Sequence, residues 1–175
     1  VRDAGEPVYG VTTGFGPLHE YAADEEGPTD HGGGLLAHLG TGTGDLADPP
    51  VVRALMTARL QALVQGHSAI RPATVEGVID VLETNLIPAV PEIGSLGASG
   101  DLTPLAHVAR ACTGRGRFLA DDGAPIDADA ALDRAGLDPL SLDARDALAL
   151  VNGTSFMTGI AALAVARGRR LLDRA

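Results

Sequence analysis

Hydrophobic and polar positions follow a helical period through most of this chain. Apolar residues recur three and four positions apart, as they do on a helix face that packs against a core. Four segments show the pattern: about 48–65, 75–86, 105–111 and 156–172. Asp48-Pro49-Pro50 marks the start of the first helix, because proline is favoured in the first turn. Shorter helices are expected over 128–135 and from Asp143 onward.

Two segments depart from this pattern. Residues 114–119, followed by the turn residues Asp121-Asp122-Gly123, predict a small β hairpin. Residues 19–34 are rich in Asp, Glu, Gly and Pro and are interpreted as a mobile acidic loop. The chain is therefore expected to be mainly α, with one small hairpin.

Composition limits the classes of function. The 175 residues are one domain's worth of chain, with the 45% hydrophobic content of an ordinary globular protein. A net charge of −10 disfavours nucleic acid or an anionic membrane as a partner. The single cysteine, Cys112, cannot form an internal disulfide, so we expect a reducing, cytoplasmic compartment. The sequence shows neither a membrane-spanning run nor metal-ligand spacing, and we expect no metal site.

One stretch carries distinctive chemistry. Residues 94–107 read Gly-Ser-Leu-Gly-Ala-Ser-Gly-Asp-Leu-Thr-Pro-Leu-Ala-His. If the Gly100 nitrogen attacks the Ala98 carbonyl carbon, a five-membered ring closes, and loss of two waters, including the Ser99 hydroxyl, leaves an exocyclic methylidene. Small residues suit such a strained turn. Thr103-Pro104 is a good N-cap and first-turn pair, so a helix is expected to begin just after the tripeptide. The alternative for the tripeptide alone is a plain turn before a capped helix.

The whole run resembles the signature of the aromatic amino acid ammonia-lyases and the related aminomutases. In that family Ala-Ser-Gly becomes the prosthetic group 4-methylideneimidazole-5-one (MIO). The resemblance implies that Ala98, Ser99 and Gly100 form MIO here. It also implies an N-terminal, MIO-bearing region over 1–142, and the first helix of a long helical bundle over 143–175.

A second signature lies in the glycine-rich segment Val8-Tyr9-Gly10-Val11-Thr12-Thr13-Gly14-Phe15-Gly16. Glycines at this density indicate a loop that lies close to what it touches, and Gly16 is assigned to substrate binding. Tyr9 matches the family's catalytic tyrosine. A phenol is a poor base in water, but a positive local field favours the phenolate that takes a proton from carbon. The alternative for Tyr9 is a packing anchor.

Specificity is assigned to His38-Leu39, which aligns with the pair that lines the family's substrate-ring pocket. Tyrosine-specific members carry His-Leu there, and a histidine can hydrogen-bond a phenol hydroxyl. The alternative is a histidine satisfied by backbone. Just before this pair the family has Leu-Gln-x-Asn-Leu, where this chain has His31, Gly32 and Gly34 in place of Leu, Gln and Asn.

The third signature covers residues 146–155, Asp-Ala-Leu-Ala-Leu-Val-Asn-Gly-Thr-Ser. It resembles the family's Glu-Gly-Leu-Ala-Leu-(Ile/Leu)-Asn-Gly-Thr, with Asp146 and Ala147 as departures. Asn152 matches an asparagine that contacts the substrate carboxylate and the MIO region. Arg59 and Arg71 are interpreted as solvated helix and loop charges, with carboxylate binding as the alternative.

The resemblance implies elimination of ammonia from an aromatic L-amino acid, with tyrosine favoured, to give an aryl acrylate. An aromatic 2,3-aminomutase, and a non-catalytic scaffold or regulatory subunit, remain as alternatives. Family members are longer and tetrameric, and each of their active sites combines loops of three chains. We therefore expect a homo- or hetero-oligomer and a second polypeptide carrying the C-terminal half. A proteolytic piece and a truncated chain are the alternatives.

Overall fold

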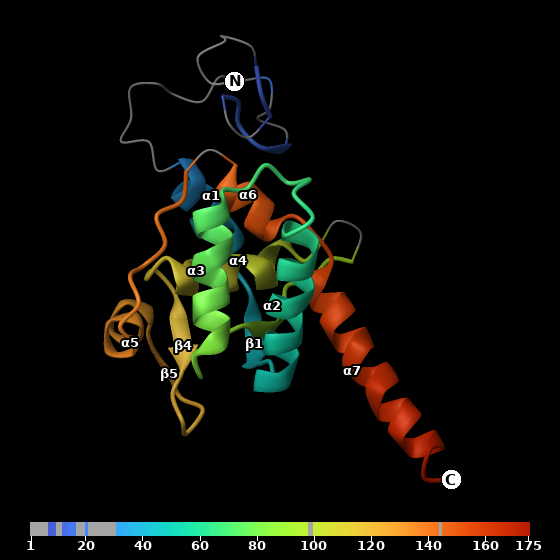
Figure 1. Cartoon of the computed structure of the whole chain (residues 1–175). Coiled ribbons are helices and arrows are strands. Elements are labelled where there is room, and N and C mark those ends of the chain that lie inside the picture. Colours follow the sequence, from blue (N-terminus) through green and yellow to red (C-terminus); the bar gives the residue numbers. More distant parts are fainter. Residues whose placement is uncertain (1–6, 10–11, 17–19, 21–30, 98–99, 144) are drawn as a thin grey trace.

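The computed structural model describes residues 7–9, 12–16, 20, 31–97, 100–143 and 145–175. This part of the chain is mainly helical (Figure 1). Its helices are α1 (His31–Leu39), α2 (Pro49–Leu63), α3 (Pro72–Glu83), α4 (Leu102–Cys112), α5 (Ala128–Ala135), α6 (Asp146–Val151) and α7 (Ser155–Leu172). The expected fold class is confirmed.

Five short strands form two small antiparallel sheets. They are β1 (Thr43–Leu46), β2 (Ile87–Pro88), β3 (Pro91–Ile93), β4 (Arg117–Leu119) and β5 (Pro125–Asp127). The predicted hairpin is confirmed as β4 and β5, which pair with Phe118 opposite Ile126. β2 extends this hairpin to three strands, and β1 pairs with β3. Strands this short carry too few residues to show an alternating pattern in sequence.

The hydrophobic core surrounds α4, which lies at the centre of the molecule in Figure 1. Most of its apolar side chains are buried, and Leu105, Ala106 and Cys112 are 0–2% exposed. α4 packs against α1, α3, α5, α6 and the strands on either side. Since α4 follows directly on the Ala-Ser-Gly segment, a largely buried helix anchors the C-terminal end of that segment.

α1 corrects the prediction for residues 31–34, which are helical rather than part of a loop. Three consecutive glycines are poor helix formers, so tertiary packing must favour the helix. A Cβ at Gly32 would lie 3.0 Å from the Cβ of Ala147 in α6. The missing side chain therefore allows α1 to approach α6 closely. The rest of the predicted acidic loop, apart from residue 20, lies outside the described residues.

α7 begins against α2 and then extends away from the body of the molecule (Figure 1). A Cβ at Gly159 would lie 2.7 Å from the backbone nitrogen of Leu55, so the two helices nearly touch at this point. Further along α7, apolar side chains are exposed, with Val165 at 60% and Leu172 at 78%. None of the described helices is long and apolar enough to cross a membrane.

Candidate functional site

The second half of the Ala-Ser-Gly turn lies beside the Asn-Gly segment of the third signature. Gly100 and Gly153 form an isolated parallel β-bridge, and the Asp101 nitrogen donates to the Gly153 carbonyl at 3.2 Å. Asn152 directly precedes this bridge, at the end of α6. Two of the predicted site segments are thus brought together by backbone pairing.

The residues on either side of Ala98 and Ser99 are hydrogen-bonded to one another. The Leu96 nitrogen donates to the Gly100 carbonyl at 2.9 Å, and the Gly100 nitrogen donates to the Gly97 carbonyl at 3.1 Å. Gly97 has φ +83°, a left-handed conformation that favours glycine. A Cβ at Gly100 would lie 2.9 Å from both the Gly97 nitrogen and the Leu96 carbonyl carbon. Ala98 and Ser99 themselves lie outside the described residues.

Asp101 attaches this turn to the start of α7. Its carboxylate is fully buried and accepts hydrogen bonds from Ser95 Oγ at 2.5 Å and from the Met157 nitrogen at 3.0 Å. Met157 is the third residue of α7, where backbone N–H groups lack a partner within the helix. The helix predicted just after the tripeptide is confirmed as α4, which begins at Leu102. Its N-cap position is held by Asp101 and not by Thr103, the residue suggested by the sequence.

The sequence did not indicate the contacts of Asp101, because its two partners lie at very different distances along the chain. Ser95 lies in the same motif, but Met157 is 56 residues further along the chain. From the sequence, an aspartate just before a helix is expected to cap the N-terminus of that helix. The Asp101 side chain makes no capping bond to α4 and bonds the other helix instead.

Asn152 has an exposed side chain and an anchored backbone. Its nitrogen donates to the Leu148 carbonyl at 3.0 Å, and the residue ends α6 in an extended conformation. The predicted interruption of the helical stretch at Asn152-Gly153 is confirmed, since α7 resumes at Ser155. An exposed amide on a fixed backbone is available to bind a ligand group.

Tyr9 is held by its own loop. The Gly16 nitrogen donates to the Tyr9 hydroxyl oxygen at 2.9 Å, and the rings of Tyr9 and Phe15 meet edge to face with centroids 6.3 Å apart. The Val8 nitrogen donates to Thr12 Oγ1 at 2.7 Å. Tyr9 remains 46% exposed. Gly16, predicted to bind substrate, here orients the phenol.

His38 and Leu39 end α1 and differ in burial. The His38 side chain is exposed, whereas Leu39 is partly buried and packs against the core. The chain after them is fixed by α4, because the Gly42 nitrogen donates to His107 Nε2 at 3.3 Å. Burial, and secondly the charge of Arg110, lower the pKa of His107, which favours the neutral acceptor.

The predicted site residues thus fall into three groups. Gly100 and Asn152 lie in neighbouring segments, Tyr9 and Gly16 share a loop, and His38 and Leu39 share a helix end. No described hydrogen bond or ring contact joins Tyr9, His38 or Leu39 to the Gly100–Gly153 bridge. Among the described residues, no group of three or more His, Cys, Asp or Glu side chains is arranged to hold a metal ion.

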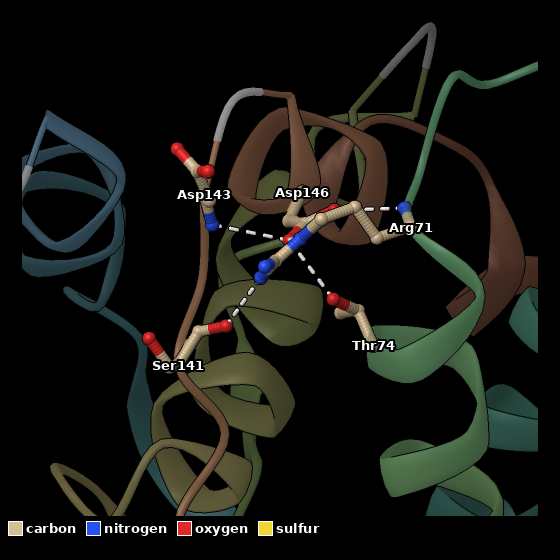
Figure 2. Close-up of polar contacts among 5 residues, drawn as sticks. All are labelled: Arg71, Thr74, Ser141, Asp143 and Asp146. Atoms are coloured by element: carbon tan, nitrogen blue, oxygen red, sulfur yellow. Dashed lines mark hydrogen bonds and ion pairs between the residues drawn. The ribbon is translucent and has the colours of Figure 1, made fainter.

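A buried carboxylate lies at the start of α6 (Figure 2). Asp146 is fully buried and accepts bonds from the Arg71 nitrogen at 3.0 Å, Arg71 Nε at 2.6 Å, Thr74 Oγ1 at 2.8 Å and the Asp143 nitrogen at 3.1 Å. Arg71 also donates through Nη2 to the Ser141 carbonyl at 2.5 Å. Arg71 therefore holds a carboxylate, the alternative left open in the sequence, and is not simply a solvated charge.

Arg59 is not a solvated charge either, so the interpretation drawn from the sequence is wrong. The residue is 8% exposed on the inner face of α2, and Nη2 donates to the Ala149 carbonyl in α6. A Cβ at Gly153 would lie against Nη1 and 3.4 Å from Cζ of Arg59. Its helical position among polar and apolar neighbours gave no signal of this burial.

Known proteins are similar to this chain in sequence. Residues 1–175 match the family model described as aromatic amino acid lyase. The chain is 48% identical to a tyrosine ammonia-lyase from Cereibacter sphaeroides, over 92% of this chain and 31% of the relative. It is 43% identical to an MIO-dependent tyrosine 2,3-aminomutase from Streptomyces globisporus, over 92% of this chain and 30% of the relative.

A similar fold is found among solved structures. Phenylalanine aminomutase from Pantoea agglomerans matches with a TM-score of 0.91 and 34% identity, over 99% of this chain and 33% of that one. The chain therefore spans about a third of the length of the relatives it matches.

Proposed function

We propose that this chain, which belongs to the aromatic amino acid lyase family, supplies the MIO-bearing part of an enzyme that eliminates ammonia from an aromatic L-amino acid. Tyrosine is the proposed substrate and an aryl acrylate the proposed product. The described structure corresponds to the N-terminal third of the family's enzymes. We further propose that 1–142 forms the MIO-bearing region, and that 143–175 begins a helical bundle that other parts of the enzyme complete.

The observation that carries this proposal is the closed turn at Gly100. The Ala-Ser-Gly sequence contains the atoms that cyclisation needs, and position 100 has no room for a side chain. Hydrogen bonds from Leu96 and to Gly97 hold both ends of the turn, and buried Asp101 ties it to α7. A rigid frame of this kind favours ring closure, since strain persists only where surrounding structure enforces it. The residues present therefore fit the MIO group.

MIO supplies an electrophilic methylidene carbon for the amine of the substrate. Asn152 has an exposed amide beside the Gly100–Gly153 bridge, which suits it to bind the substrate carboxylate. Tyr9 is the proposed base for the β-proton, with its oxygen oriented by the Gly16 nitrogen. His38 and Leu39 are the proposed contacts of the substrate ring, because an exposed imidazole can bond a phenol hydroxyl.

Partners are part of the proposal. Tyr9 and His38 make no described hydrogen bond to the bridge, and α7 exposes apolar side chains that a bundle would cover. We propose that the active site is completed by further copies of the enzyme and by the remaining two thirds of its length. Cytoplasmic location belongs to the same proposal.

Cofactor formation is tested by intact mass. In the assembled, active protein this chain should weigh two waters less than its sequence, and Ser99→Ala should abolish both the deficit and turnover. Thr57→Ala is a control for loss of a hydroxyl away from the turn, because Thr57 is exposed on α2 and donates to the Arg53 carbonyl of the same helix. This variant should leave the water deficit in place. An unmodified mass in an active sample would refute the proposal.

Specificity is tested by turnover of tyrosine and phenylalanine. We expect tyrosine to be preferred, and His38→Phe to reverse that preference by removing the partner of the hydroxyl. A hydrogen bond of this kind is worth about 1.5–3 kcal/mol if one of its partners is charged. Faster turnover of phenylalanine or histidine by the unaltered enzyme would refute this role of His38.

The products distinguish the remaining candidates. The similarity to a tyrosine 2,3-aminomutase favours one alternative, in which the amine returns to the β-carbon. Release of ammonia with an aryl acrylate identifies a lyase, and a β-amino acid identifies a mutase. Absence of both in a fully assembled protein would identify a scaffold or regulatory subunit.

A further inference from the structure

A buried positive charge lies directly behind the candidate site. Arg59 is 8% exposed, and burial lowers the pKa of its guanidinium. No described carboxylate pairs with it, and its Nε has no hydrogen-bond partner among the described residues. Burying an unpaired cation is costly. An apolar side chain of similar length would avoid this cost, so the guanidinium must make contacts that such a side chain cannot.

The contacts of Arg59 lie on the segment that carries Asn152. Nη2 donates to the carbonyl of Ala149, in the last turn of α6, where carbonyl groups lack partners within the helix. A cation at a helix C-terminus also interacts favourably with the helix dipole. Arg59, reaching across from α2, thus caps the helix that ends at Asn152.

The same guanidinium supports the bridge to the Ala-Ser-Gly turn. Gly153 lies against Nη1 of Arg59, and a Cβ there would fit only if the guanidinium moved. On the other side Gly153 pairs with Gly100, and its carbonyl accepts from Asp101. The position of the guanidinium therefore sets how far the Asn152-Gly153 segment can move away from the turn.

We propose that Arg59 is a positioning residue, whose guanidinium fixes the segment from Ala149 to Gly153 so that Asn152 faces the substrate and Gly100 is held for ring closure. This inference rests on the proposed function for its link to catalysis. A displacement of the segment should weaken substrate binding more than it slows the chemical step, because Asn152 binds the substrate carboxylate throughout the reaction.

The test compares Arg59→Met and Arg59→Lys in the complete enzyme. Arg53→Met is the matched control, because Arg53 lies on the same helix and also donates to a backbone carbonyl, that of Thr84 at the end of α3. Arg59→Met should raise KM for tyrosine about tenfold or more, since a small misplacement can cost up to about a hundredfold. It should also lower the fraction of chains that have lost two waters.

Rescue by lysine separates the charge from the shape of the guanidinium. Lysine can still donate to the Ala149 carbonyl, but it lacks the planar group that lies against Gly153. The KM of Arg59→Lys should therefore lie between that of Arg59→Met and that of the unaltered enzyme. Its kcat per mature chain should be nearly unchanged. If Arg59→Met does not assemble, the same comparison is made with Arg59→Lys, and a KM equal to that of Arg53→Met would overturn the proposal.

A double-mutant cycle with Gly153→Ala tests the contact itself. The added methyl group should be harmful beside Arg59 and less harmful in the Arg59→Met background. Amide hydrogen exchange over residues 149–157 reports this coupling without any substrate. Independent effects of the two substitutions would overturn the proposal. An unmodified and inactive wild-type protein would instead refute the proposed function, so the two failures are distinct.

Discussion

Removal of the Asp146 carboxylate should open the start of α6. Asp146 is fully buried and accepts four hydrogen bonds from Arg71, Thr74 and Asp143 (Figure 2). Breaking a buried ion pair by removing one partner costs about 3–5 kcal/mol. The Arg71 side chain is 42% exposed and can be rehydrated. We therefore expect Asp146→Ala to cost about 3 kcal/mol, at the lower end of that range.

Amide hydrogen exchange measures this local cost in the assembled protein. A loss of about 3 kcal/mol makes exchange over 143–151 roughly a hundredfold faster. Thr74→Val, which removes one bond and keeps the shape, should cost about 1–2 kcal/mol. Asp80→Asn is the control, because this aspartate is exposed on the same helix as Thr74. If exchange in Asp146→Ala rises no more than in Asp80→Asn, the buried carboxylate does not stabilise α6.

Three further predictions concern packing and titration. Gly32→Ala should destabilise the fold less in the Ala147→Gly background, by about 1 kcal/mol or more, because the two positions compete for the same space. Thermal unfolding of the unaltered protein, the two single variants and the double variant tests this, and additive effects would refute it. Burial raises the pKa of Cys112 to about 12, so an alkylating reagent at pH 8 should label it only after denaturation, as followed by mass spectrometry. The pKa of His107 is lowered by burial, then by Arg110, so below about pH 6.5 the unfolded chain binds a proton that native His107 does not. Stability should then fall with falling pH until the folded pKa is passed, and His107→Gln should flatten that slope.

The sequence alone predicted the described helices other than α1, the hairpin and the family, because these depend on local patterns. The pattern of Asp48-Pro49-Pro50 and the following apolar positions predicted α2, and the Asn152-Gly153 interruption correctly separated α6 from α7. The Ala-Ser-Gly motif also predicted a tight turn, and Gly97 and Gly100 have the backbone of one. Capping residues, glycine and helical periodicity act over a few residues, so they are visible in the order of amino acids.

Only the tertiary structure showed which distant groups meet. Arg59 and Ala149 are 90 residues apart, and Arg71 and Asp146 are 75 apart, and no local pattern indicates either pair. The helix through Gly32 was also missed, because packing against Ala147 outweighs its poor helix propensity. A side chain's burial and charge partners depend on which faces pack together, and that is decided by the whole fold.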